Sequence, residues 1–150
     1  MTITHQDELD GLKVIGRIVA NTLHSMAAAM EPEMTTRELD GIGHALLERE
    51  GAVSAPRASY DFPGTTCISV NEEIAHGIPG ERRLAAGDLV NIDVSASLNG
   101  FFADTGASFC LGPVQPSRGQ LCHDGKRPQQ KGQAAGGPDN DRARARTPQP

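Results

Sequence analysis

The sequence has no run of about 18 apolar residues, and its N-terminus lacks a basic region followed by an uninterrupted apolar segment. These absences argue against a membrane span and a secretory signal. Cysteine is scarce, and Cys67, Cys110 and Cys122 show no close spacing of the kind that zinc sites use. An odd number of cysteines leaves at least one thiol unpaired, so we expect reduced thiols and a cytoplasmic protein.

The end of the chain lacks the residues that build a core. From Cys122 to Pro150 there is no Val, Ile, Leu, Met, Phe, Tyr or Trp. Such a segment cannot bury enough apolar surface to offset its ordering entropy, so we predict that it is disordered. This segment has six Lys and Arg and three Asp, a net charge of +3, whereas the whole chain has a net charge of −5. The first 121 residues therefore carry about −8, which argues against a nucleic-acid partner.

Two amphipathic helices are predicted in the first third of the chain. Apolar residues recur at spacings of three and four between positions 6 and 30, and again after position 38. Thr35 and Glu38 form a capping-box pattern at the start of the second helix, and Gly51 fits the left-handed position that ends it.

The middle of the chain predicts strands. Residues 67–70 form a short strand, and 89–96 with 101–110 form a hairpin, while 56–63 and 71–80 are predicted to be irregular. Two helices able to cover one face of a small antiparallel sheet indicate an α+β fold.

The hairpin places two carboxylates together. Asn99-Gly100 favours a type I′ turn, which pairs Leu98 with Phe101 and makes Asp93 and Asp104 diagonal neighbours on one face. Their Cβ atoms would lie roughly 7 Å apart, close enough to hold one divalent ion or to bridge two. Alternatively, Asp93 bonds to the backbone and the residues after Asp104 form an ordinary turn.

His76 lies in a loop that contains Gly77 and Pro79, where a constrained backbone can aim a side chain into a cleft. Its imidazole could donate a hydrogen bond to a substrate carbonyl near neutral pH. A lone histidine is more often structural or simply exposed, and the other four histidines have no comparable setting.

Three segments together resemble the type I methionine aminopeptidases. They are the loop Asn71-Glu-x-x-x-His-Gly-Ile-Pro79 with the residues before it from Asp61, the strand region 87–96, and the segment 100–109. The resemblance covers roughly Leu9 to Pro113. It implies that Asp93 and Asp104 are metal ligands, that His76 contacts the substrate and assists catalysis, and that Phe62 lines the methionine pocket.

The resemblance also implies a pita-bread fold, in which two pseudo-symmetric halves enclose two divalent metal ions, Co, Mn, Fe or Zn. We expect residues 1–112 to form the N-terminal half of that catalytic domain and residues 113–150 to be a disordered tail foreign to the family. No glutamate follows Glu81, and His123 does not match the family's ligand histidine. The family's remaining ligands therefore have no counterpart in this sequence.

The resulting expectation is a truncated methionine aminopeptidase with little or no activity alone. An intact relative would use a metal-activated hydroxide to remove the N-terminal methionine of nascent polypeptides. Two alternatives remain open at this point: a non-catalytic module that binds ribosome-associated or homologous partners, and a decayed gene product. The sequence predicts no membrane partner and does not fix an oligomeric state.

Overall fold

The computed structural model describes residues 3–113 of the chain. The predictions of a disordered, foreign tail after Gly112 concern residues that lie almost entirely outside this range and stay predictions. The described elements, in chain order, are α1 (Gln6–Ala29), α2 (Thr36–Arg49), β1 (Val53–Ser54), α3 (Ala55–Tyr60), β2 (Cys67–Val70), β3 (Leu89–Leu98) and β4 (Phe101–Cys110).

Both long helices occur where the sequence predicts them. At the start of α2, the Thr35 hydroxyl accepts a hydrogen bond from the Glu38 N–H at 3.1 Å, and the Glu38 carboxylate accepts one from the Thr35 N–H at 2.7 Å. This reciprocal pair is the predicted capping box. Gly51 has a φ of +70°, and the Ala52 N–H donates to the Leu47 carbonyl, so the predicted left-handed helix end is also confirmed.

The four strands form one antiparallel sheet around β3. β4 pairs with one edge of β3 along its whole length, while β1 and β2 pair with different parts of the other edge. Leu98 lies opposite Phe101, and both Asn99 and Gly100 have positive φ, as a type I′ turn requires. The predicted register of the hairpin is therefore confirmed.

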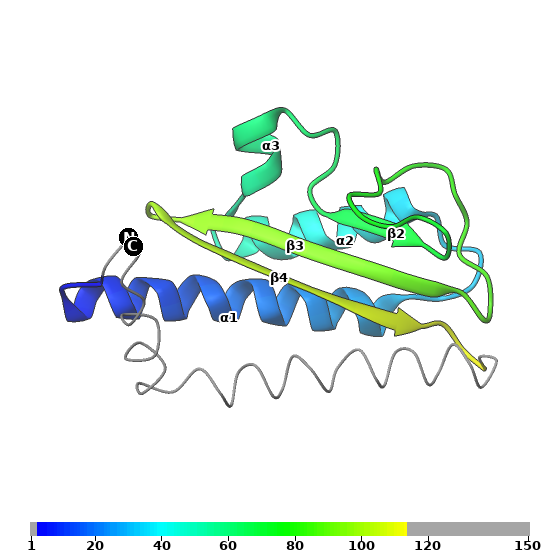
Figure 1. Ribbon diagram of the computed structural model, residues 1–150, viewed down its shortest axis with the longest axis horizontal. Coiled ribbons are helices and arrows are strands. Elements are labelled where there is room, and N and C mark those ends of the chain that lie inside the picture. The colour runs from blue at the N-terminus through cyan, green and yellow to red at the C-terminus, as the bar shows by residue number, and fades with distance from the viewer. Residues whose placement is uncertain (1–2, 114–150) are drawn as a thin grey trace, which may run out of the picture. The chain divides into compact units, whose positions relative to one another are not determined.

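The helices α1 and α2 lie on one side of the sheet, and α3 lies on the other (Figure 1). Alternate residues of β3 face the two long helices and are fully buried, which accounts for the apolar alternation in the sequence. The core between these layers contains, among others, Ile15, Val19, Met26, Leu39, Leu47, Ile68, Val70, Val90, Ile92 and Val94. The fold is thus the predicted α+β arrangement, with one helix layer supporting a hairpin whose second face is available for a site.

The prediction of an irregular connection over residues 56–63 is wrong for its first part. Residues Ala55–Tyr60 form α3, and β1 precedes it. The Ser54 hydroxyl caps this helix and Pro56 lies in its first turn, where proline's fixed φ suits a helix and its missing N–H costs nothing. A six-residue helix is too short to show an apolar period, so the periodicity that revealed α1 and α2 could not reveal α3.

None of the helices described is long and apolar enough to cross a membrane.

Candidate functional site

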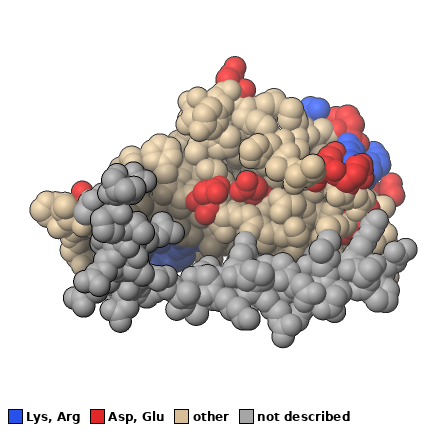
Figure 2. All heavy atoms as spheres, in the orientation of Figure 1, with Lys and Arg blue, Asp and Glu red and all other residues tan. Residues whose placement is uncertain are grey.

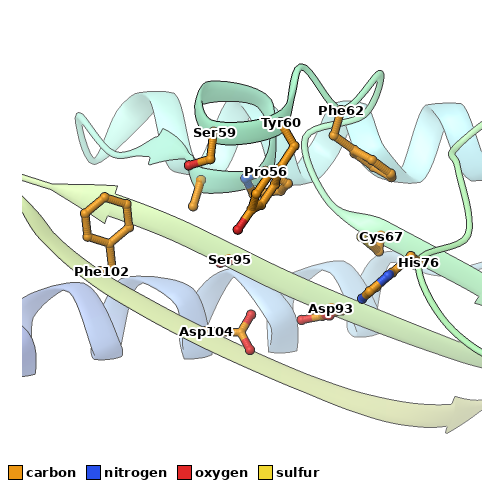
Figure 3. Close-up of a pocket in the computed structure, with 11 residues that line it drawn as sticks. Pro56, Ser59, Tyr60, Phe62, Cys67, His76, Asp93, Ser95, Phe102 and Asp104 are labelled. Atoms are coloured by element: carbon orange, nitrogen blue, oxygen red, sulfur yellow. The ribbon is translucent and has the colours of Figure 1, made fainter.

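A cavity of about 610 Å³ opens on the face of the sheet opposite α1 and α2. It collects side chains from α3, from the segment before β2, from the loop after β2 and from both arms of the hairpin (Figure 3). All four residues singled out from the sequence, Phe62, His76, Asp93 and Asp104, line this cavity.

The two aspartates approach each other from neighbouring strands. Asp93 lies opposite Gly106, and Asp104 lies opposite Ser95, so the carboxylates are diagonal neighbours on one face of the hairpin. Both point into the cavity in Figure 3. Acidic side chains are visible near the middle of this face in the space-filling view (Figure 2).

Asp93 is the more constrained of the two. Its Oδ1 atom is buried and, within the described part of the chain, has no hydrogen-bond partner. Gly106 lies opposite Asp93, and a Cβ there would be in ordinary van der Waals contact with this oxygen, at 3.5 Å. Burial, and then the negative charge of Asp104, raise the pKa of Asp93 to about 6, while the nearby His76 opposes the shift.

Cys67 pairs with Asp93 on the other edge of β3 and also lines the cavity. Burial raises the pKa of its thiol to about 11, and the charges of Asp93 and Asp104 add to the shift. The thiol therefore stays protonated at neutral pH. The sequence analysis did not place Cys67 in the site. The missing information was the pairing of β2 with β3, which puts Cys67 opposite Asp93.

The segment that leads to Cys67 is tied to the helix layer by Asp40 of α2. The Asp40 carboxylate accepts hydrogen bonds from the backbone N–H groups of Thr65 and Thr66, and from the Thr66 hydroxyl at 2.7 Å. Thr65 and Thr66 are almost completely buried, so this carboxylate satisfies donors that have no access to water. The cavity wall after Phe62 is thereby fixed to the core.

Aromatic side chains border the cavity above the carboxylates. Phe62 lies there as predicted, and Tyr60 and Phe102 join it (Figure 3). Tyr60 is 82% exposed and Phe102 is 58% exposed, so this apolar border is open to solvent within the structure described. Tyr60 was missed because α3 was missed, and Phe102 shares its face with Asp104 by simple alternation along β4.

The donor set is suited to a divalent metal but is not sufficient to hold one. Carboxylate oxygens are the ligands that Mn²⁺ and Mg²⁺ prefer, and Asp93 offers a buried oxygen that has no hydrogen-bond partner among residues 3–113. However, no group of three or more His, Cys, Asp or Glu side chains within residues 3–113 could hold a metal ion. A resident metal would need further ligands beyond the two aspartates.

Comparison with known proteins decides the family. The sequence profile of metallopeptidase family M24 matches residues 10–140. The chain belongs to this metallopeptidase family. The match runs past Gly112, so it does not itself mark the boundary predicted there.

This chain is similar to methionine aminopeptidases in both sequence and structure. It is 54% identical over 133 residues to methionine aminopeptidase 2 of Bacillus subtilis, which covers 88% of this chain and 53% of that relative. The crystal structure of methionine aminopeptidase from Rickettsia prowazekii matches with a TM-score of 0.76 at 31% identity, covering 82% of this chain and 50% of that one. The corresponding enzyme from Thermotoga maritima matches with a TM-score of 0.78 at 25% identity, again over 50% of its length.

The M24 chain therefore spans about half the length of the relatives that it matches. Its α+β unit is one half of the pita-bread fold, as the resemblance implied. Membership of a metallopeptidase family implies use of a divalent metal, and the comparisons do not favour the alternative of a non-catalytic interaction module.

Proposed function

We propose that this chain carries the N-terminal part of a methionine aminopeptidase site, in which Asp93 and Asp104 are metal ligands. The observation that supports this most directly is the Oδ1 atom of Asp93, which is buried beside Asp104 in a cavity and has no hydrogen-bond partner within the described range. A buried carboxylate oxygen without a partner costs free energy, and a bound cation would remove that cost. When bound, divalent metal ions would supply a water activated for attack and would polarise the carbonyl of the first peptide bond.

The remaining cavity residues have roles that fit a peptide with an N-terminal methionine. Phe62, Tyr60 and Phe102 form an apolar wall that suits a long, flexible thioether side chain. His76 approaches Asp93 from the loop above it and can donate a hydrogen bond to the substrate carbonyl. The proposed substrates are polypeptides with an N-terminal methionine, and the proposal includes action on nascent chains in the cytoplasm.

Residues 3–113 alone should hold a metal weakly and should not complete the reaction. Two carboxylates from one hairpin leave most coordination positions to water, and ligand number largely sets affinity. The preferred metal, among Co, Mn, Fe and Zn, depends on ligands outside this pair. Catalysis would require these ligands from a further part of the polypeptide or from another chain.

Calorimetric titration of the full 150-residue chain with Mn²⁺ tests the proposal. We expect weak binding that is lost in Asp93→Asn and Asp104→Asn, and that persists in Asp61→Asn, a control that removes an exposed carboxylate outside the hairpin. Equal binding by all four proteins would overturn the assignment of the ligands. Release of methionine from a Met-Ala-Ser peptide by the chain alone would show that the site is more complete than proposed.

A further inference from the structure

The loop between β2 and β3 carries His76 in a conformation that few residues adopt. His76 has a φ of +54°, in the left-handed region, and its own side chain is exposed in the open cavity. No burial of the imidazole therefore fixes its direction. The backbone on either side of His76 must set the conformation.

The ends of this loop are attached on either side of His76. The Arg82 guanidinium pairs with the carboxylates of Glu72 and Glu73 at 2.9 and 2.8 Å, and the Thr36 hydroxyl accepts a hydrogen bond from the Gly80 N–H. The ion pairs are largely solvent-exposed, where such pairs contribute little. These contacts close the loop but lie three or more residues from His76.

Gly77, the residue after His76, is bound directly to β2. Its carbonyl accepts a hydrogen bond from the Ile68 N–H at 2.9 Å, and its N–H donates to the Ser69 hydroxyl at 3.0 Å. Both polar groups of the Gly77 backbone are thus held by two successive residues of one strand. The bond from the Gly77 N–H to Ser69 holds the peptide plane that joins His76 to Gly77, and the bond to the Gly77 carbonyl holds the next plane, between Gly77 and Ile78.

The attachment depends on a close approach between backbones. A Cβ on Gly77 would stand 2.1 Å from the Ile68 carbonyl oxygen and 2.9 Å from the Ser69 Cα. Those are backbone atoms of β2, which is paired with β3, and they cannot turn aside as a flexible side chain could. Only glycine allows the loop to lie this close to β2.

Ser69 supplies the one side-chain contact in this attachment. It alternates with Ile68 and Val70, which face the helices, so it shares the open face of the sheet with Cys67. Yet Ser69 is only 2% exposed, and its hydroxyl accepts the Gly77 N–H where water has little access. An alanine there would leave that N–H without an acceptor.

We propose that Ser69 is a positioning residue, which holds the His76–Gly77 peptide so that the imidazole is presented to the substrate beside Asp93 and Asp104. Ser69 does not touch the reacting atoms itself. The orientation of the His76 side chain matters for catalysis only if the proposed function is correct, and the inference rests on it in that respect. The positioning itself can be measured without metal or substrate.

NMR of the full chain tests the inference. A strong intraresidue cross-peak between the His76 amide and α protons reports its positive φ, and hydrogen exchange of the Gly77 amide reports the bond to Ser69. In Ser69→Ala we expect the cross-peak to weaken and the Gly77 amide to exchange about three to ten times faster. Ser69→Thr, which keeps the hydroxyl, should show the same His76 cross-peak and the same Gly77 exchange rate as the unaltered chain.

A matched control separates positioning from general stability. Ser54 is also buried, and its hydroxyl donates to the Thr65 carbonyl at 2.7 Å and accepts from the Arg57 N–H, both of which lie outside the His76 loop. Ser54→Ala should leave the His76 and Gly77 signals unchanged. If Ser69→Ala does not fold, Ser69→Cys keeps a side chain of similar shape with a weaker acceptor and should show a smaller shift of the same signals.

A His76 cross-peak that is unchanged in Ser69→Ala would overturn the inference, as would equal effects of Ser54→Ala. Absence of Mn²⁺ binding, with the His76 signals still dependent on Ser69, would instead reject the proposed function and leave the positioning role intact.

Discussion

At the scale of single residues, Asp93 makes the metal-free protein sensitive to pH. Its folded pKa of about 6 lies above the ordinary aspartate value of 3.8, so between about pH 4 and pH 6 the folded state holds a proton that the unfolded state has released. This contribution is fully present below about pH 4 and is lost as the pH rises through 6. Asp93→Asn, which removes the charge, should therefore raise the free energy of unfolding at pH 7 by about 1 to 2 kcal/mol, allowing for solvent screening.

Urea denaturation with a chelator present, at pH 4.5 and at pH 7, measures this effect. The difference between Asp93→Asn and the unaltered chain should be large at pH 7 and small at pH 4.5. Asp61→Asn serves as the control, because Asp61 is exposed and asparagine also adopts its left-handed φ of +54°. A destabilised Asp93→Asn at pH 7 would mean that the carboxylate has a partner after all.

At the scale of elements, substituting alanine at two glycines that have space for a side chain should change the stability of the protein in opposite directions. Neither Gly100, in the hairpin turn, nor Gly41, in α2, has an atom within 4 Å of where a Cβ would stand. Gly100 has a φ of +84°, so Gly100→Ala should cost about 1 to 2 kcal/mol of backbone strain. Gly41 is helical, so Gly41→Ala should stabilise the chain by about 0.5 to 1 kcal/mol.

Thermal unfolding of the two variants under one set of conditions gives the comparison directly. Equal shifts would show that the hairpin turn does not impose its conformation on Gly100.

The elements also show what a sequence can reveal. The hairpin register was predictable because alternation and the Asn99-Gly100 turn agree, and that register alone brings Asp93 to Asp104. α3 was not predictable, because six residues are too few to show a helical period of apolar residues. The position of Tyr60 in the cavity wall was missed for the same reason. The attachment of Gly77 to Ser69 depends on where a loop folds back in space, which no local pattern encodes.

At the scale of the whole molecule, the chain corresponds to about half of the relatives it resembles. We expect that a separately produced polypeptide matching the remainder of the Bacillus subtilis relative will restore methionine release when mixed with this chain and Mn²⁺. The physical reason is that the two carboxylates described here would then gain the ligands that a two-metal site requires. The assay is release of methionine from Met-Ala-Ser.

Asp93→Asn in the same mixture should abolish the release, while Asp61→Asn should not. Restoration that survives Asp93→Asn would show that the activity comes from the added polypeptide alone.

The residue-by-residue pairing of β3 with β4 constrains the number of residues between Asp93 and Asp104 more strictly than it constrains which residues they are. Inserting or deleting a single residue within the paired segments 96–98 or 101–103 would turn one acidic side chain toward the helices while leaving the other in place, whereas an added residue in the turn would only lengthen the loop. Changes of two residues would preserve the facing of both. Tolerated length variation within these strand segments should therefore come in even steps, a parity rule that a library of insertions would reveal without any assay of chemistry.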